Sequence, residues 1–501
     1  MKKKPLSTGA EWTFDLLQAY DREIGRIAKD FKLDTYPNQI EMISAEQMID
    51  AYASVGMPIN YSHWSFGKHF VSVEKNYQRG AMGLAYELVI NSNPCVSYLM
   101  EENTMAVQAL VIAHACYGHN SFFKNNYLFK MWTSADAIID YLVFAKNYIS
   151  ECEERYGIEE VETILDACHA LMNYGVDRYK HPTPLSIQEE KIRQQNRAIY
   201  LQSEVNELWR TIPKGPDVGP LKKKQFPSEP QENILYFIEK HAPLLQPWQR
   251  EIVRIVRKIA QYFYPQQQTK VMNEGWACFW HYTLLHALYD EQLVTDEFML
   301  EVLQTHTNVI MQPPYNSPYY QTINPYTLGY HMMQDIRRIC ERPTDEDKHW
   351  FPDLANTDWL SSLDTAMRYY KDESFIAQYL SPHIIRELKL FHIIDDDRHA
   401  EYSIGAIHNE LGYQQIRDVL SSQYNLGNQE PDIQVFSVNL EGDRALTLHY
   451  TQRNRIPLGK TTADVLKHLH VLWKFPVILK AVNEAGETTA EFQCPPVENK
   501  A

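Results

Sequence analysis

Two histidines placed five residues apart are the strongest indication of chemistry in this chain. His114 and His119 lie in the segment AHACYGHN (113–120), at the end of an almost entirely apolar stretch that predicts a buried helix. HExxH metallopeptidases space two histidines by four, so that both face one ion, and place a glutamate between them as general base. A spacing of five turns the second histidine by about 140° on a regular helix, unless Gly118 or a π-bulge corrects the rotation. Ala115 stands where that glutamate would be.

A glutamate inside an aromatic, apolar segment is the second indication. Glu274 lies in MNEGWACFWH (272–281), where a buried carboxylate is costly unless a cation or a partner compensates it. His281 follows seven residues later on the same helix face. In two-helix metallopeptidase sites, a glutamate on the second helix is the third ligand. We therefore predict a site for a divalent metal, zinc, with His114, His119 and Glu274 as ligands and His281 as a fourth ligand or supporting residue. Core histidines, a helix cap and a buried Glu–His or Glu–Arg pair are the structural alternatives.

Three further residues would complete a hydrolytic site. Tyr326 and His331 lie in NPYTLGYH (324–331) and would stabilise an oxyanion if they lie beside a cleft. A role in capping a helix is an equally good explanation for the two residues. Glu102 precedes the helix that leads to His114, and it is the carboxylate we nominate as general base. A negative charge at a helix N-terminus is the alternative for Glu102.

A basic stripe is formed by Arg250, Arg254 and Arg257, at spacings of four and three. Such a stripe would bind the carboxylates of an acidic substrate. A solvated helix face or structural salt bridges are the more common outcome of this pattern.

The elements that must position these residues are mostly helices. Apolar residues recur every three or four positions in 17–31 and 248–262, which predicts amphipathic helices. After about residue 385 the pattern changes to strands at 434–438, 445–450 and 476–482, with a helix at 462–473. We expect a mainly α fold: a large helical domain, 1–382, carries the metallopeptidase-like two-helix site, and a small α/β domain, 385–490, follows it.

Composition narrows the function classes. The 501 residues include 48 Lys and Arg against 64 Asp and Glu, a formal net charge of −16, which excludes an overall basic field for nucleic acid. The seven cysteines are scattered and show no CxxC, which indicates a reducing compartment. No apolar run is long enough for a membrane span and none follows the N-terminal lysines, so we expect a cytoplasmic protein.

Four segments together resemble one known family, the SpoVR family, named for stage V sporulation protein R. They are AHACYGHNSFFKNN (113–126), the block from 248 to 282, NPYTLGYHMMQDIRRI (324–339) and QYNLGNQEPDIQV (423–435). The resemblance implies a part in spore cortex formation. It also implies a stress-related role with a serine protein kinase and a von Willebrand type A domain protein as partners. It does not supply a biochemical activity.

The residues favour a metal-dependent hydrolase of an amide bond, acting on a peptidoglycan-derived peptide. A helical-bundle iron or manganese protein with oxidative chemistry remains open, although the Glu-x-x-His pairs of di-iron bundles do not occur at these motifs. A non-enzymatic regulator or scaffold of the kinase pathway also remains open, and in it the buried histidines and glutamates would be structural.

Overall fold

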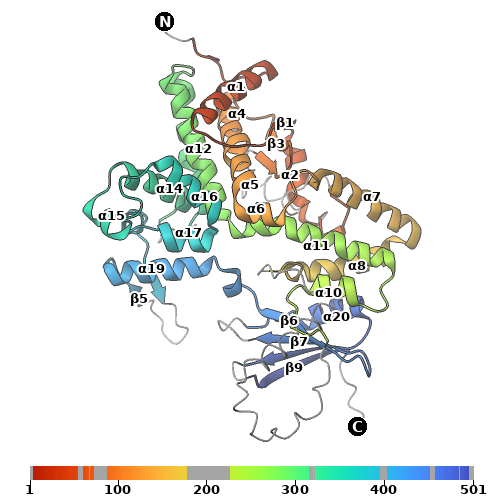
Figure 1. Ribbon diagram of the computed structural model, residues 1–501. Coiled ribbons are helices and arrows are strands. Elements are labelled where there is room, and N and C mark those ends of the chain that lie inside the picture. Colours follow the sequence, from red (N-terminus) through yellow and green to blue (C-terminus); the bar gives the residue numbers. More distant parts are fainter. Residues whose placement is uncertain are drawn as a thin grey trace, which may run out of the picture. The chain divides into compact units, whose positions relative to one another are not determined.

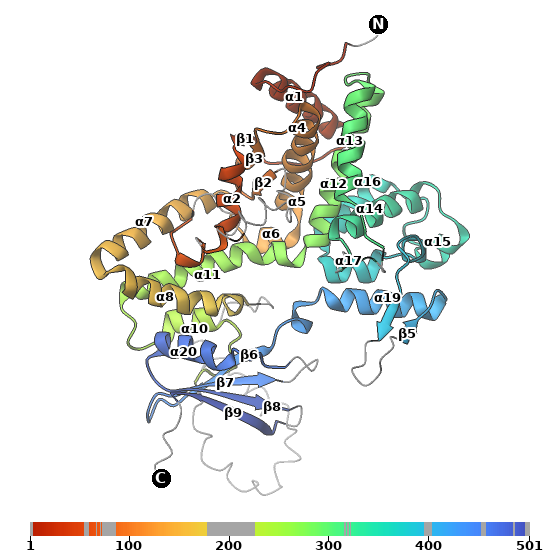
Figure 2. The same cartoon turned by 180° about the vertical axis from the view of Figure 1, so that it is seen from behind.

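The chain forms two compact units in a computed structural model (Figures 1 and 2). One unit comprises Met1–Ile158 and Gln261–Glu430, and the other comprises Glu159–Ala260 and Pro431–Ala501. The structure describes residues 4–54, 60–66, 68–70, 72, 87–177, 226–314, 317, 320, 322–394, 403–451, 457–483 and 486–495. The division differs from the predicted boundary near 382, because residues 383–430 lie in the helical unit and 159–260 join the C-terminal strands.

The first unit is mainly helical, as predicted, and it also contains two small sheets. Its elements are α1 (Phe14–Asp30), β1 (Asn38–Ile43), α2 (Ala45–Ala53), β2 (Glu87–Ile90), β3 (Cys95–Met100), α4 (Met105–Val111), η1 (Ile112–His119), α5 (Asn120–Asn125), α6 (Tyr127–Trp132), α7 (Ile138–Tyr156), α12 (Lys270–Asp290), α13 (Asp296–Val309), α14 (Pro325–Glu341), α15 (Asp345–Trp350), α16 (Trp359–Tyr369), α17 (Asp372–Tyr379), α18 (Pro382–Glu387), β4 (His392–Ile394), β5 (Ser403–Ala406), α19 (Glu410–Gln423) and η4 (Leu426–Asn428).

Helix α12 is the centre of this unit and packs against α14 and η1. Glycines permit backbone contact at both crossings. A Cβ atom on Gly275 would lie 2.3 Å from the carbonyl carbon of Gly329 on α14, and one on Gly118 would lie 2.6 Å from Cα of Ala277. These approaches bring the side chains of η1, α12 and α14 to one place.

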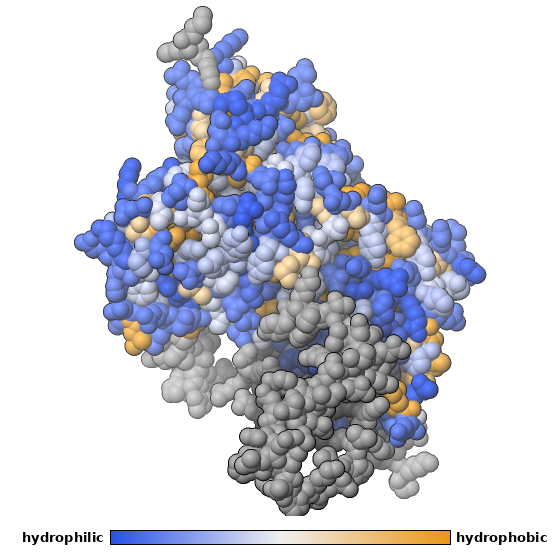
Figure 3. All heavy atoms as spheres, in the orientation of Figure 1, coloured by the Kyte–Doolittle hydropathy of each residue, from blue (hydrophilic) through white to orange (hydrophobic). Residues whose placement is uncertain are grey.

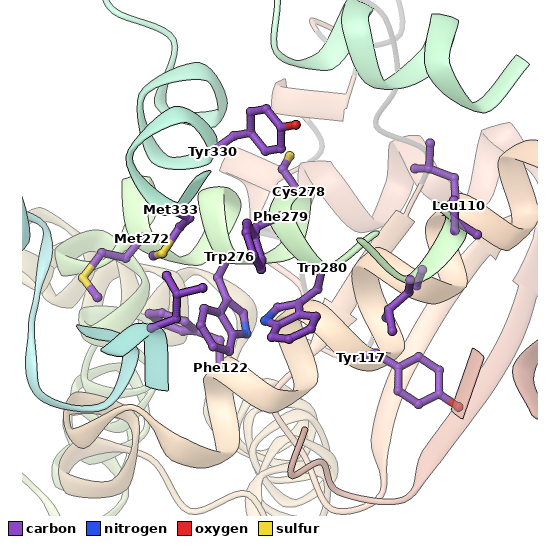
Figure 4. Close-up of a cluster of buried hydrophobic side chains, with 14 of the residues drawn as sticks. Leu110, Tyr117, Phe122, Met272, Trp276, Cys278, Phe279, Trp280, Tyr330 and Met333 are labelled. Carbon is purple, nitrogen blue, oxygen red and sulfur yellow. The ribbon is translucent and has the colours of Figure 1, made fainter. Parts of the chain in front are cut away.

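Aromatic side chains of α12 pack in the hydrophobic core of this unit (Figure 4). Trp276 and Trp280 are both buried, with ring centroids 5.5 Å apart in an edge-to-face arrangement. Phe279 is also fully buried and contacts Trp280 edge-on at 5.3 Å. A polar atom of this helix that points into this packing is therefore held away from water.

A three-stranded sheet, in the order β1-β3-β2, lies beside the helices. Strand β3 is parallel to β1 and antiparallel to β2. Strand β2 also contacts η1, and its first residue is Glu87. This sheet was not predicted, and it adds a carboxylate to the site.

The second unit is a small α/β unit built around a four-stranded sheet. Its order is β6-β7-β8-β9, with β7 and β8 parallel and the outer pairs antiparallel. The predicted strands and helix between 434 and 482 are confirmed, whereas the last strand was not predicted. The elements are α8 (Ile158–Ala170), η2 (Met172–Tyr174), α10 (Ile234–His241), the first part of α11 (Pro247–Gln268), β6 (Asp432–Val438), β7 (Leu446–Thr451), α20 (Thr462–Trp473), β8 (Val477–Val482) and β9 (Thr488–Cys494).

The exposed residues are mostly polar on the face that Figure 3 shows, where hydrophobic residues form small separate patches. Among the helices that the structure describes, none is both long and apolar enough to cross a membrane.

Candidate metal centre

A π-helical turn brings the two histidines of the first motif together. Element η1 continues α4 without a break, and its hydrogen bonds connect residues five apart, so a spacing of five returns to the same side. The rings of His114 and His119 lie with centroids 4.6 Å apart and nearly perpendicular. Both residues are buried, at 3% and 6% exposure. The π-bulge is therefore the solution that this fold has for the five-residue spacing.

The carboxylate of Glu274 reaches both histidines from α12. Its Oε2 atom lies 3.5 Å from Nε2 of His119 and 3.8 Å from Nε2 of His114. That oxygen is buried and has no hydrogen-bond partner among the residues that the structure describes. Two atoms bound to one tetrahedral ion by bonds of about 2.1 Å lie about 3.4 Å apart. The observed distances of 3.5 and 3.8 Å are closer to this ligand–ligand distance than to the length of a direct charge-assisted hydrogen bond, which is about 2.7–2.9 Å.

Glu87 is a fourth member of the site, which sequence reasoning missed. Its Oε1 atom lies 3.4 Å from Nε2 of His114. Ligand atoms of Glu87, His114 and His119 all lie within 4.8 Å of one another. A glutamate at the start of a four-residue strand carries no local pattern that separates it from a solvated strand end. We call Glu87, His114, His119 and Glu274 the carboxylate–histidine cluster.

The electrostatics of the cluster favour a cation beside Glu274. Burial by itself would raise the pKa of Glu274, yet the charges of His119 and His114, whose Nε2 atoms lie 3.5 and 3.8 Å from its Oε2 atom, hold that pKa well below its usual range. Burial lowers the pKa of His119, but the Glu274 carboxylate outweighs burial and raises it overall. A proton on His119 or a metal ion would each supply the positive charge that this buried carboxylate requires.

Asn273 orients the second histidine. Nδ1 of His119 lies 2.9 Å from Oδ1 of Asn273, and a carbonyl oxygen accepts a hydrogen bond, so Nδ1 of His119 is the donor. In the neutral ring, Nε2 then keeps its lone pair and faces Glu274. Such support of the outer ring nitrogen is typical of metal-binding histidines.

His281 lies behind His114 and does not face Glu274. Its Nδ1 atom is 2.9 Å from Nδ1 of His114, and its Nε2 atom is 2.7 Å from Nδ1 of His306 on α13. Both ring nitrogens of His281 therefore have histidine partners, and neither is shown contacting Glu274. The Sγ atom of Cys278 lies within 4.8 Å of one ring nitrogen of His114 and one of His281. Burial raises the pKa of its thiol well above the usual value, so it is not a reactive thiolate here.

The structure brings Tyr326 to the cluster and places His331 elsewhere. The negative charge of Glu274, together with burial and a hydrogen bond to that carboxylate, raises the pKa of Tyr326 well above its usual value. His331 is half-buried, and its Nδ1 atom lies 3.3 Å from Oε1 of Glu387. Of the predicted oxyanion pair, Tyr326 is in position to act at Glu274, whereas His331 pairs with another carboxylate.

Glu102 is not brought to the site. It is exposed on the turn before α4, and its Oε1 atom accepts a hydrogen bond from the backbone N–H of Ala45 at 3.1 Å. Helix α4 begins only at Met105, and the nine residues from there to His114 rise by about 14 Å. This separation corrects the nomination of Glu102 as general base, and Glu87 is the carboxylate that takes its place beside His114.

The three arginines hold a glutamate of their own unit. Arg257 and Arg254 reach the Glu239 carboxylate at 2.8 and 3.1 Å, and Arg250 donates to the Glu239 backbone carbonyl at 2.6 Å. Glu239 is buried, and its pKa is lowered because hydrogen bonds and charges from Lys240 and the arginines outweigh the effect of burial. The three arginines therefore form structural salt bridges, one of the two alternatives to substrate binding for this stripe. These contacts do not support the predicted role in binding an acidic substrate.

Comparisons with known proteins agree on one family. Residues 11–429 match the family described as SpoVR like protein, and residues 431–484 match the SpoVR-like C-terminal domain. The chain is 64% identical over 492 residues to "Uncharacterized protein YcgB" of Escherichia coli (strain K12). The aligned region covers 98% of this chain and 96% of that protein. No solved structure matches the chain significantly. As its motifs indicate, the chain belongs to the SpoVR family.

Proposed function

We propose that the carboxylate–histidine cluster binds one divalent metal ion, zinc, and hydrolyses an amide bond. The observation that carries this proposal is the buried Oε2 atom of Glu274, which faces two imidazole nitrogens at ion-sharing distances and has no hydrogen-bond partner within the described part of the chain. A buried carboxylate oxygen without a partner is costly, and a bound cation removes that cost.

The donor set divides into ligands and a base. His114, His119 and Glu274 form a two-histidine, one-glutamate set, the composition of catalytic zinc sites that keep a fourth position open for water. An ion held by these residues would supply a water of lowered pKa at that position. Glu87, beside His114, would accept the proton of that water, the role that a glutamate has in HExxH enzymes. This assignment supplies the base that the sequence motif itself lacks.

Tyr326 provides the hydrogen bond that an amide substrate requires. Its raised pKa keeps the phenol protonated at neutral pH, so it can donate to the oxyanion that forms on the substrate carbonyl. The substrate that we propose, a peptide derived from peptidoglycan, rests on the resemblance to the sporulation family and on no contact in the site.

Elemental analysis with one substitution tests the site. The purified protein should carry one zinc ion per chain. Glu274→Gln should lose the ion while keeping a near-normal thermal midpoint, since the amide has the same shape. Glu297→Gln, the same change at an exposed position of α13, is the matched control. A Glu274→Gln protein with full metal content and a large fall in Tm would identify a buried ion pair instead. Release of fluorescent products from quenched peptides, with and without chelator, then tests hydrolysis.

One observation also favours iron or manganese at the same residues. The cluster has two carboxylates and two imidazoles, and carboxylate-rich sets suit manganese and non-haem iron as well as zinc. In this case elemental analysis of protein from iron-replete cells would show iron or manganese. The iron form would consume oxygen with a reductant, and peptide hydrolysis would be absent.

A further inference from the structure

Three buried histidines form a continuous hydrogen-bonded chain that leads away from the cluster. Nδ1 of His114 lies 2.9 Å from Nδ1 of His281, and Nε2 of His281 lies 2.7 Å from Nδ1 of His306. The three residues are 3%, 0% and 4% exposed and come from η1, α12 and α13. Only the Nε2 atom of His114 faces the carboxylates.

Each contact joins two nitrogens, so exactly one proton must lie between them. A neutral imidazole has one N–H and one acceptor nitrogen. The position of a single proton on His114 therefore fixes the tautomers of both other rings. The two hydrogen bonds can therefore run in two ways: both donate toward His306, or both donate toward His114. If all three rings are neutral, no other arrangement satisfies both hydrogen bonds.

These two arrangements correspond to two states of the cluster. If Nε2 of His114 carries hydrogen, it donates toward Glu87, and its Nδ1 atom accepts from His281. If Nε2 of His114 offers its lone pair to an ion, Nδ1 carries the hydrogen and donates to His281. His281 then donates from Nε2, and Nδ1 of His306 must accept.

We propose that His306 is a positioning residue for the metal centre, because its Nδ1 atom is the terminal acceptor that holds His114 in the ion-binding tautomer. This inference rests on the proposed function. Outer hydrogen-bond partners of metal-binding histidines fix the tautomer and orientation of the ring in the same way. Here the partner acts through a second imidazole, from a different helix.

The surroundings of His306 keep it a neutral acceptor. Burial, followed by the positive charges that His286, His114 and His331 would carry, lowers its pKa to about 4. The rings of Tyr282 and Tyr330 lie 5.0 and 4.7 Å from its centroid and enclose it. Both nitrogens of His281 already have histidine partners. We therefore interpret the three histidines as a hydrogen-bonded series, and not as ligands that hold a second ion with Cys278.

Two substitutions of His306 test the proposal, one that keeps a hydrogen-bond acceptor and one that removes it. His306→Asn keeps an acceptor oxygen near the position of Nδ1, and His306→Leu removes it. Zinc affinity, measured by competition with a chromophoric chelator, should fall about 10- to 100-fold in His306→Leu and stay within about threefold of wild type in His306→Asn. His349→Leu, the same change at an exposed position of α15, is the control.

The tautomeric states of His281 and His306 can also be measured directly in the wild-type protein. Histidine ¹⁵N shifts should show hydrogen on Nε2 of both His281 and His306 in the zinc-loaded protein. Wild-type affinity in a folded His306→Leu, or hydrogen on Nδ1 of His281 in the loaded protein, would overturn the inference and leave the metal site standing. A wild-type protein that binds no ion would overturn the proposed function, and two ions per chain would overturn the chain of hydrogen bonds.

Discussion

Gly275 of α12 lies against Gly329 of α14 in direct backbone contact, and this contact places Tyr326 beside Glu274. A Cβ atom on Gly275 would lie 2.3, 2.4 and 2.8 Å from backbone atoms of Gly329. Tyr326 is one turn before Gly329 on α14, and Glu274 is adjacent to Gly275. The two residues of the proposed reaction are thus aligned by a crossing that only glycine permits.

Gly275→Ala should destabilise the protein and lower its metal content. An alanine inside a helix is intrinsically favoured over glycine by up to about 1 kcal/mol. Here the added methyl group meets backbone atoms that cannot rotate away, so we expect a net loss of about 1–3 kcal/mol in the free energy of unfolding. Chemical denaturation measures this loss. Gly9→Ala, where a Cβ meets nothing within 4 Å, should leave stability and metal unchanged.

Glu87→Gln tests whether Glu87 is the proposed base or a further metal ligand. The amide cannot accept a proton, so hydrolysis should fall by about 10²- to 10⁴-fold while zinc affinity changes little. Metal content and peptide hydrolysis are measured on the same preparation. Glu41→Gln, at an exposed position of β1 in the same sheet, is the control. Loss of the ion in Glu87→Gln would make Glu87 a ligand and leave the base unassigned.

Local patterns in the sequence were sufficient to predict that His114, His119 and Glu274 lie together, but not the carboxylate from the sheet. The apolar spacing that predicted a helix at 17–31 matches the buried face of α1, which includes Leu17, Tyr20 and Ile24. His114, His119 and Glu274 were found because polar residues in apolar helices are conspicuous. Glu87 could not be found, because strand pairing between β2 and β3 depends on contacts that no short window contains.

The same limit explains the misplaced boundary. The change from helical to strand pattern occurs near 385, but α19 packs against α17 and belongs to the helical unit. Residues 159–260 join the C-terminal strands through contacts such as the bridge between Gln231 and Val435. Association of segments about 200 residues apart is set by tertiary packing, which composition and periodicity do not reveal.

Asp372 caps the helix that carries Glu274, although it is about 100 residues away in sequence. Its two carboxylate oxygens accept hydrogen bonds from the backbone N–H groups of Val271 and Met272 at 2.8 and 2.9 Å. The N-cap residue Thr269 supplies no side-chain cap. Asp372→Ala should therefore cost about 1–3 kcal/mol, because it leaves two buried donors without partners. Asp372→Asn, which keeps one acceptor, should cost less; equal losses in thermal denaturation would contradict the capping role.

The same carboxylate predicts a pH dependence of stability. Burial raises the pKa of Asp372 to about 7, despite the two backbone hydrogen bonds that lower it. The unfolded chain releases this proton near pH 4. Between about pH 4 and 7 the folded state binds more protons at this position, so its contribution to stability falls as pH rises through that window. Asp372→Asn cannot ionise, and it should show a smaller decline in the free energy of unfolding between pH 4 and 7 than wild type. Parallel curves for the two proteins would contradict the raised pKa.

Two truncations distinguish the observed units from the predicted domains. A chain that ends at 382 lacks α19, which buries Tyr413, Ile416 and Leu420 in the helical core. Loss of three such side chains removes on the order of 5 kcal/mol of apolar burial, so this truncation should unfold or aggregate. A chain that ends at Glu430 keeps every residue of the carboxylate–histidine cluster and the whole helical unit, while residues 159–260 lose the strands that they pack with. It should therefore retain one ion per chain. Metal analysis and circular dichroism of both truncations make the comparison. A folded 430-residue chain without metal would show that the C-terminal strands help to build the site, and a stable metal-loaded 382-residue chain would restore the boundary that the sequence pattern indicated.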